Sequence, residues 1–314
     1  GSIMLPSMVK SGYSTESSAG LVAAAGALGP IIPPSIPMII YGVTMSLSIP
    51  AMFIAGIVPG LVIAAALSIV NVIFSYKNPE ILKHAGQTKF DLKYSLKMFW
   101  KALGALGLPV LILGGIYGGI FTPTESAAVG IVYALVVGFA LKELKLKDLP
   151  RILISSLKTS TMVNFIIAAA SIFSWVVSKS QIGAAISAAF ITLVNGNQNM
   201  YLFVLVMILL VVGCLMDNVA ATLILAPILI PVGISLGCNE LHIGMLFCIC
   251  LVVGFVTPPF GYNLFTAVSI SGLNFKQIVK GSIPFLLTEI ALLFVFAYVP
   301  AIITWLPKLM GYSY

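Results

Sequence analysis

Gly29-Pro30-Ile31-Ile32-Pro33-Pro34-Ser35-Ile36-Pro37 is the stretch that decides the fold, together with a second one, Gly254-Phe255-Val256-Thr257-Pro258-Pro259-Phe260-Gly261. Each lies inside an apolar run long enough to cross a membrane. A Pro-Pro pair removes two backbone donors and disfavours helical conformation at the preceding residue, so each run must be a broken helix. A break inside a bilayer persists only against protein or a water-filled cavity, because its freed carbonyl groups need partners. Two such breaks in one chain are typical of the binding site of a secondary transporter.

The composition is that of a polytopic membrane protein. Of the 314 residues, 60% are hydrophobic and 8% are charged, and the mean hydropathy is +1.13. A soluble domain carries about 25% charged residues, so this chain has too little polar surface to cover itself. The net charge of +7 does not indicate a nucleic-acid partner, because the basic residues cluster between apolar runs, as in cytoplasmic loops. The four cysteines lack metal-ligand spacing and no catalytic set is visible, so no enzyme is expected.

The chain contains an internal repeat with an offset of 225 residues. Seven glycine or proline pairs coincide at this offset: Pro6 with Pro231, Gly12 with Gly237, Gly29 with Gly254, Pro33 with Pro258, Pro34 with Pro259, Gly56 with Gly281, and Pro59 with Pro284. These residue types mark breaks, caps and close contacts, so their coincidence indicates two copies of one structural unit. The counterpart of the polar interruption at 213–218 would fall before residue 1. The first copy is therefore predicted to be incomplete, with sequence missing upstream.

The apolar runs predict an all-α polytopic membrane protein. The expected elements are a helix at 13–31 that breaks at Pro33-Pro34 and resumes to 44, helices at 48–74, 102–120, 127–141, 152–177 and 240–256, a short re-entrant segment at 182–194, two half-length runs at 200–212 and 219–235 that form a hairpin with its tip inside the membrane, and a last helix from Asn274 to about residue 305. Asn274 and Gln277 resemble a capping box at the start of that last helix.

The lysine positions indicate an orientation. The basic segments at 76–101 and 142–151 flank two crossings, which places both segments on the cytoplasmic side. The last helix begins with Lys276 and Lys280, whereas its counterpart near Pro50 ends in a lysine-rich segment. Equivalent helices with lysines at opposite ends have opposite topology. The repeat is therefore predicted to be inverted, with the C-terminus outside the cytoplasm.

The two Pro-Pro breaks are candidate cation sites. The groups that they offer are the backbone carbonyls of Gly29, Ile32, Gly254 and Thr257 and the side chains of Ser35, Thr257 and Asn263. Hard cations such as sodium prefer oxygen ligands of this kind. A purely structural kink is the alternative, and the recurrence of the break at equivalent positions favours ion binding.

Three acidic residues lie in apolar surroundings. Asp217 lies at the tip of the predicted hairpin, where an ionisable residue is costly and usually functional; the alternative is a helix N-cap in a solvated loop. Glu125 belongs to Thr122-Pro123-Thr124-Glu125-Ser126, which is either a polar cluster facing substrate or ion or only a capping box. Glu289 is interpreted as a buried structural pair or a subunit contact, with a transported proton as the minor alternative.

At these residues the chain resembles the DctM family, the large membrane subunit of tripartite ATP-independent periplasmic (TRAP) transporters. The matching stretches are Gly29 to Ser35 with Tyr41-Gly42, Phe53 to Gly60, Gly114 to Ala128, Asp217 to Pro231, and Gly254 to Gly261. They cover most of the chain. The departure is at the N-terminus, where the family has further helices and the first half of its first hairpin.

The resemblance implies a sodium-coupled importer of the bacterial inner membrane, in which a transport domain moves against a scaffold as an elevator. It also implies a small DctQ-type membrane subunit and a DctP-type periplasmic binding protein. The solute would be acidic: a C4-dicarboxylate, a sialic acid or another sugar acid. Arg151 is the only arginine and lies in a cytoplasmic loop, so a carboxylate would be held by hydroxyl groups, half-helix N-termini and bound sodium.

The resemblance also implies roles for individual residues. One sodium site would use Gly29, Ile32 and Pro33, and a second would use Gly254, Thr257 and Pro258 with Gly213 and Asp217 nearby. The expected substrate contacts are Ser35, Thr124, Glu125, Ser126, Asn218 and Asn263. The implied division is a first transport-domain repeat at 1–48, a scaffold helix and basic loop at 49–101, central helices and a basic loop at 102–198, a second transport-domain repeat at 199–273, and a C-terminal scaffold helix at 274–314. Sodium is the only cofactor expected.

Two other functions are weighed against this one. A sodium/dicarboxylate symporter that needs no binding protein would share inverted hairpins. A scaffold or channel-like membrane subunit would bind partners without coupled transport, and sodium-coupled accumulation of a solute would exclude it.

Overall fold

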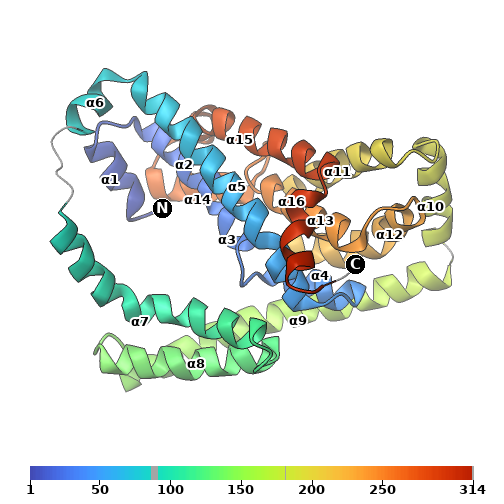
Figure 1. Ribbon diagram of the computed structural model, residues 1–314, viewed down its shortest axis with the longest axis horizontal. Helices are drawn as coiled ribbons and strands as arrows, with labels where there is room; N and C mark the ends of the chain where they lie inside the picture. Colours follow the sequence, from blue (N-terminus) through green and yellow to red (C-terminus); the bar gives the residue numbers. More distant parts are fainter. Residues whose placement is uncertain (86–90, 181, 313–314) are drawn as a thin grey trace. The chain divides into compact units, whose positions relative to one another are not determined.

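The computed structural model describes residues 1–85, 91–180 and 182–312, and the described chain is built from helices (Figure 1). They are α1 (Met4–Lys10), α2 (Thr15–Gly26), α3 (Leu28–Ile31), α4 (Ile36–Met45), α5 (Ile49–Tyr76), α6 (Pro79–Ala85), α7 (Leu92–Tyr117), α8 (Pro123–Ala140), the 3-10 turn η1 (Leu146–Asp148), α9 (Leu149–Lys179), α10 (Ile182–Leu193), α11 (Gln198–Leu215), α12 (Asn218–Ser235), α13 (Glu240–Gly254), α14 (Tyr262–Ser271), α15 (Phe275–Tyr298) and α16 (Ala301–Leu309). Six helices in the described ranges are long and apolar enough to cross a membrane, or up to eight if each of two bent pairs forms one span. The chain is an all-α, multi-pass membrane protein, as predicted.

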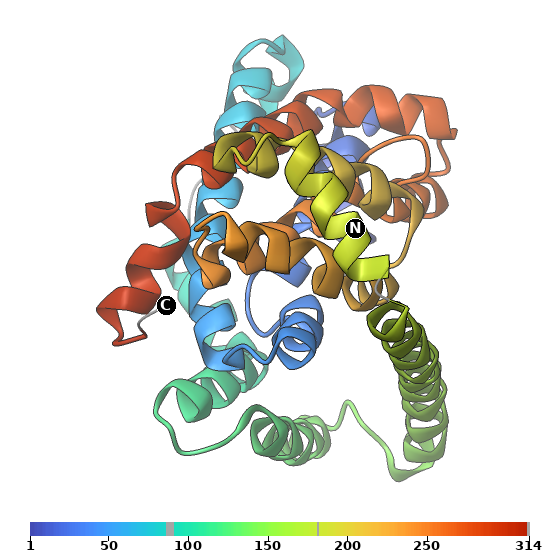
Figure 2. The ribbon, with the colours of Figure 1, turned by 90° about the vertical axis from the view of Figure 1, so that its right-hand side faces the viewer.

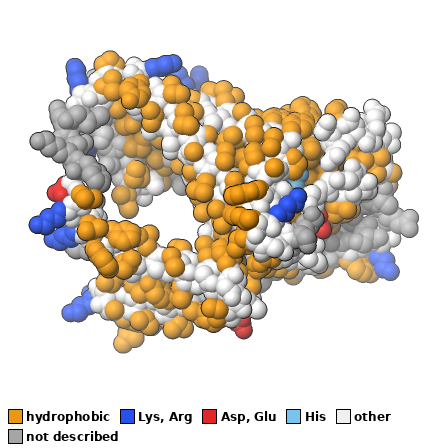
Figure 3. Space-filling model, in the orientation of Figure 1, with side chains coloured by type: hydrophobic (Ala, Val, Ile, Leu, Met, Phe, Trp, Pro, Cys, Tyr) orange, Lys and Arg blue, Asp and Glu red, His pale blue; other side chains and the backbone are white. Residues whose placement is uncertain are grey.

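Large apolar side chains are exposed along most of these helices. Figure 3 shows hydrophobic side chains spread over the visible face, with only a few Lys and Arg side chains visible among them. The apolar window of the span at 146–173 has none of its residues buried in the described chain. A surface of this kind is suited to lipid or to an apolar partner rather than to water.

The chain forms two compact units, one made of residues 1–88 and 169–314 and the other of residues 89–168. The smaller unit contains the antiparallel pair α7 and α8, in which Tyr133 Oη donates a hydrogen bond to the Gly104 carbonyl at 2.9 Å. The larger unit contains both Pro-Pro breaks and both copies of the repeat. In two views, α12 and α13 lie side by side within this unit (Figures 1 and 2). The division into transport and scaffold parts stays a prediction.

The helices of the larger unit follow the sequence repeat. The paired helices α2 and α13 begin at Thr15 and Glu240, 225 residues apart, whereas α4 with α14 and α5 with α15 begin 226 residues apart. Side chains cap the starts of α2, α13, α5 and α15 in the same way, because Ser14, Asn239, Ser48 and Asn274 each accept a backbone N–H of the first turn. The two copies therefore share element order, boundaries and caps.

Each copy packs its broken helix against the long helix of the other copy. Gly20 of α2 meets Gly281 of α15 so closely that a Cβ on either residue would overlap the opposing backbone. Their counterparts at the 225-residue offset are Met245 of α13 and Gly56 of α5, and a Cβ on Gly56 would lie 3.3 Å from Met245 Cε. An exchange of partners between equivalent positions is the sign of two-fold pseudosymmetry.

The long helices α5 and α15 run in opposite directions. The end of α5 lies beside the start of α2, because Tyr13 Oη and Ser75 Oγ are 2.8 Å apart. The start of α15 lies beside the same end of α2, where Gln277 Nε2 donates to Glu16 Oε1 at 3.1 Å. Figure 1 shows the two helices running in opposite directions from this point. The inverted repeat inferred from the lysine positions is thus present in the geometry.

The predicted basic loop at 76–101 is wrong in part, since much of its described portion is helical. Helix α6 occupies Pro79–Ala85, and α7 begins at Leu92, where Asp91 Oδ1 accepts the Tyr94 N–H at 3.1 Å. Lysine is a good helix former, so a basic segment need not be irregular. Residues 86–90 of this predicted loop, Lys89 among them, lie outside the described residues.

Two further boundaries differ from the prediction. The hairpin helices α11 and α12 have 18 residues each rather than half-length runs, which is about 27 Å of helix and close to the thickness of a bilayer core. Gly213 does not end α11, so the break is confined to Met216 and Asp217. The last long helix ends at Tyr298 rather than near residue 305, because Pro300 lacks an N–H and the separate helix α16 follows.

Candidate ion and solute site

The second break is a tight turn after α13. Thr257 N donates to the Gly254 carbonyl at 3.0 Å, and Thr257 Oγ1 donates to the Val253 carbonyl at 3.1 Å. The Pro258–Pro259 peptide bond is cis, and α14 begins after Gly261, whose φ is +57°. The Gly254 carbonyl, a predicted sodium ligand, is therefore already engaged in the turn, although a carbonyl oxygen has a second lone pair.

Two carbonyl oxygens converge in this turn. A Cβ placed on Gly261 would lie 3.0 Å from both the Phe255 and the Thr257 carbonyl oxygens and 2.8 Å from Leu264 Cδ1, so the two oxygens lie close to the same point. The Phe255 carbonyl also accepts the Asn263 N–H at 3.0 Å. Converging uncharged oxygens suit a hard cation. Thr257 was predicted from the sequence; Phe255 was not, because the sequence does not show which further carbonyl the turn brings beside Gly261.

The hairpin tip lies against this second break. A Cβ on Gly213 would lie 2.7 Å from the Leu251 carbonyl oxygen, and a Cβ on Gly254 would lie 2.5 Å from the Gly213 carbonyl carbon. The Gly261 N–H donates to the Cys214 carbonyl at 3.4 Å. The absence of side chains on the two facing glycines is what allows this contact. The structure thus brings Gly213 to Gly254, as expected from the family motif.

Asp217 and Asn218 start α12 but have different surroundings. Asp217 is exposed, and its Oδ1 accepts the Val219 N–H at 2.9 Å, which is the geometry of an N-cap. A sodium-binding role for Asp217 stays a prediction. Asn218 is only 3% exposed, and neither its Oδ1 nor its Nδ2 has a hydrogen-bond partner in the described parts of the chain.

The first break has a similar local structure. The Pro33–Pro34 peptide bond is cis, and Ile32 is extended. The buried Ser35 donates its hydroxyl to the Pro30 carbonyl and caps the start of α4, so this predicted substrate contact is engaged in the break itself. Gly29 is exposed, and a Cβ there would meet no described atom within 4 Å.

Asn263 connects the second break to the first broken helix. Its Nδ2 donates to the Ala23 carbonyl in α2 at 3.1 Å. Together with Gly26 it lines a cavity of about 150 Å³ between α2 and α14. This places a predicted substrate contact where the two copies meet.

The cluster around Glu125 belongs to the smaller unit. The N–H and the hydroxyl of Thr122 both donate to Glu125 Oε2 at 2.8 Å, and Thr122 Oγ1 accepts the Glu125 N–H at 3.3 Å. The capping box is therefore formed. Thr124 and Glu125 are exposed, whereas Ser126 is buried. The substrate role expected for these three residues stays a prediction.

Glu289 faces the interior of the larger unit at 1% exposure. Neither of its carboxylate oxygens has a hydrogen-bond partner among the described residues. The buried structural pair is therefore not formed within the described chain, and the alternative expected from the sequence, a subunit contact, stays a prediction. The equivalent residue of the first copy is Ala64, so this acid has no counterpart there.

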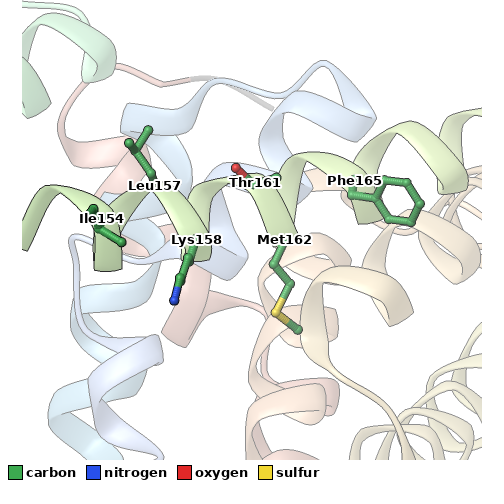
Figure 4. Close-up of a pocket in the computed structure, with 6 residues that line it drawn as sticks. All are labelled: Ile154, Leu157, Lys158, Thr161, Met162 and Phe165. Carbon is green, nitrogen blue, oxygen red and sulfur yellow. The ribbon is translucent and has the colours of Figure 1, made fainter. Parts of the chain in front are cut away.

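An open groove runs along α9 in the smaller unit (Figure 4). It measures about 550 Å³ and is lined by Ile154, Leu157, Lys158, Thr161, Met162 and Phe165. Lys158 and Met162 point to the same side of the helix in the close-up. All six residues come from one helix, so the groove is an exposed helix face rather than an enclosed binding site.

Residues 1–302 match the family described as "Tripartite ATP-independent periplasmic transporter, DctM component". The C4-dicarboxylate TRAP transporter large permease protein DctM of Pseudomonas aeruginosa is 38% identical over 100% of this chain and 72% of its own length. The isethionate TRAP transporter permease protein DctMQ of Oleidesulfovibrio alaskensis is 38% identical over 96% of this chain and 47% of its own length. The sialic acid TRAP transporter large permease protein SiaM of Vibrio cholerae is 32% identical over 100% of this chain and 73% of its own length.

Proposed function

Because the chain belongs to the DctM family of TRAP transporters, we propose that it forms the membrane pathway of a sodium-coupled importer for an acidic organic solute. The family is one of transport proteins, which agrees with the expectation that the chain is not an enzyme. The partners that we propose are a small membrane subunit and a periplasmic binding protein. The location is the bacterial inner membrane, with the segments at 76–101 and 142–151 cytoplasmic and the C-terminus periplasmic.

The observation that carries the sodium proposal is the second break. The carbonyls of Phe255 and Thr257 converge beside Gly261. The hairpin packs against the turn through the Gly213–Gly254 contact. Uncharged oxygens in a partly enclosed turn replace the hydration shell of a hard cation. The first break, with Gly29, Ile32 and Pro33, would supply a second site of the same kind.

Relatives and charge support an acidic solute. The relatives are named for transport of a C4-dicarboxylate, isethionate and sialic acid. Arg151 is the only arginine of the chain and belongs to the smaller unit. An acid bound between the breaks of the larger unit would therefore be held by hydroxyl and amide donors, helix N-termini and bound sodium.

The contact between Gly213 and Gly254 also bears on how the proposed transport domain moves. Since Gly213 and Gly254 touch through their backbones, the hairpin tip and the second broken helix would shift together. In the elevator mechanism that we propose, this pair carries ion and solute across the membrane against a scaffold that includes α5 and α15. Sodium binding would favour the closed, loaded form.

Uptake by the complete transporter in proteoliposomes tests this function. The transporter would contain the small subunit and the binding protein, and labelled succinate or labelled sialic acid would be supplied with and without an inward sodium gradient. Uptake that requires both sodium and the binding protein is expected. Uptake that is indifferent to sodium would contradict the coupling, and uptake without the binding protein would favour a dicarboxylate symporter instead.

A further inference from the structure

Asn218 and Thr222 form a pair of buried polar side chains without partners. They lie four residues apart on α12, so they share one face of the helix. Asn218 is 3% exposed and Thr222 is 0% exposed. Within the described ranges, Asn218 Oδ1, Asn218 Nδ2 and Thr222 Oγ1 all lack a hydrogen-bond partner. Buried polar groups are normally paired, because an unpaired one destabilises the fold.

Thr222 differs from other threonines on the helices of this chain. The hydroxyl of a helical threonine usually donates to the carbonyl four residues earlier. Thr44, Thr192, Thr266, Thr288 and Thr304 all do so, at distances of 2.7 to 3.1 Å. The buried hydroxyl of Thr222 makes no such bond. It is therefore free to donate to a group outside its own helix.

The position of the pair favours an anion over a cation. Asn218 is the first residue of α12, whose 18 residues place a partial positive charge at this end. The Asn218 amide and the Thr222 hydroxyl add two hydrogen-bond donors one turn apart. The neighbouring carboxylate of Asp217 is exposed and is engaged with the Val219 N–H. Helix α12 packs against α4 and α13, which belong to the two broken helices.

We propose that Asn218 and Thr222 hold a carboxylate of the transported solute, with Asn218 Nδ2 and Thr222 Oγ1 each donating to one carboxylate oxygen. The inference rests on the proposed function and adds Thr222, which no sequence pattern singled out. Because both side chains are closed off from solvent here, the solute reaches them only when α12 shifts relative to its neighbours.

The test compares variants of the complete transporter in proteoliposomes, with labelled succinate and labelled sialic acid as probes. Solute concentration is varied at saturating sodium, and sodium concentration is varied at saturating solute. Thr222→Val removes only the hydroxyl, and we expect the solute KM to rise roughly tenfold or more. Asn218→Asp replaces a donor with a negative charge and should raise the KM further. Neither variant should change the sodium concentration for half-maximal uptake.

Two controls separate a binding role from a structural one. Thr222→Ser keeps the hydroxyl and should retain the wild-type KM. Thr304→Val removes a buried hydroxyl that is already bonded to the Pro300 carbonyl, and it should also leave the KM unchanged. Gel filtration in detergent checks that each variant is folded; if Thr222→Val is not, the nearly isosteric Asn218→Asp variant decides.

Distinct results would overturn the inference. Unchanged solute KM in Thr222→Val and Asn218→Asp would show that the pair does not touch the solute. A lower sodium requirement in Asn218→Asp would assign the pair to a cation instead. A wild-type transporter that takes up neither probe under a sodium gradient contradicts the proposed function itself. In that case the thermal stabilisation that each probe gives in detergent is compared between wild type and Thr222→Val. A smaller stabilisation of Thr222→Val supports binding of the solute by Asn218 and Thr222, and an equal one contradicts it.

Discussion

At the second break the hairpin tip brings Gly213 against Gly254, whereas at the first break the equivalent residue, Gly29, faces no described atom within 4 Å. Both breaks contain a cis Pro-Pro bond. The first break follows α2 and α3 and the second follows α13, which occupy equivalent places in the two copies. The comparison shows that the proline pair determines the local backbone, while a neighbouring segment determines whether the break is enclosed.

The largest effect is expected from adding a methyl group at the enclosed break. In Gly254→Ala the new Cβ would lie 2.5 Å from the Gly213 backbone, and such overpacking costs about 1–3 kcal/mol. Gly29→Ala meets no described neighbour and should be neutral or stabilising by up to about 1 kcal/mol, because alanine favours helix. Thermal unfolding of the purified chain in detergent measures both. An equal loss of stability in Gly29→Ala would mean that both breaks pack against a neighbouring segment.

A smaller effect is expected from removing the charge of Asp217 at the hairpin tip. Asp217→Asn keeps an N-cap but removes the carboxylate charge. If Asp217 contributes to a sodium site, the sodium concentration for half-maximal uptake should rise about tenfold, which corresponds to about 1.4 kcal/mol. Asp217→Ala, which also removes the cap, serves as the companion variant. A sodium response altered only by Asp217→Ala would reduce the role of Asp217 to capping.

The smallest effects compare equivalent caps in the two copies. Asn274 and Gln277 bond each other's backbone N–H at 3.0 and 3.1 Å, whereas Ser48 only accepts the Ala51 N–H at 3.4 Å. Asn274→Ala should therefore cost about 1 kcal/mol of folding free energy and Ser48→Ala about 0.5 kcal/mol. Thermal unfolding of the two variants side by side measures the difference. Identical losses would show that the reciprocal bond of Gln277 adds nothing.

Features that depend on glycine, proline and capping residues could be predicted from the sequence. The breaks, the 225-residue repeat and the caps at Thr122 and Asn274 depend on backbone restrictions or local hydrogen bonds, and these are encoded within a few residues. The inverted arrangement was also predictable, because lysine positions differ between equivalent helices. The lengths of the hairpin helices could not be predicted, because neither Gly213 nor the apolar run beside it indicates where a helix ends.

Features of the candidate site that arise from tertiary structure could not be predicted. The Phe255 carbonyl is a group that every residue carries, and only the turn aims it beside Gly261. Thr222 looks like any threonine in an apolar helix, and only its missing bond to the preceding turn sets it apart. Glu289 was expected to have a partner because buried charges usually do, but the described chain supplies none.

Because each broken helix packs against the long helix of the other copy, the two broken helices meet their partners at different times during synthesis. Helix α2 is made long before its partner α15, since the bonded residues Glu16 and Gln277 are 261 positions apart. Helix α13, in contrast, emerges when α5 is already present. Chains are made from the N-terminus onward, and a broken helix in lipid needs protein against it. The first broken helix therefore stays without its partner α15 until that helix has been inserted.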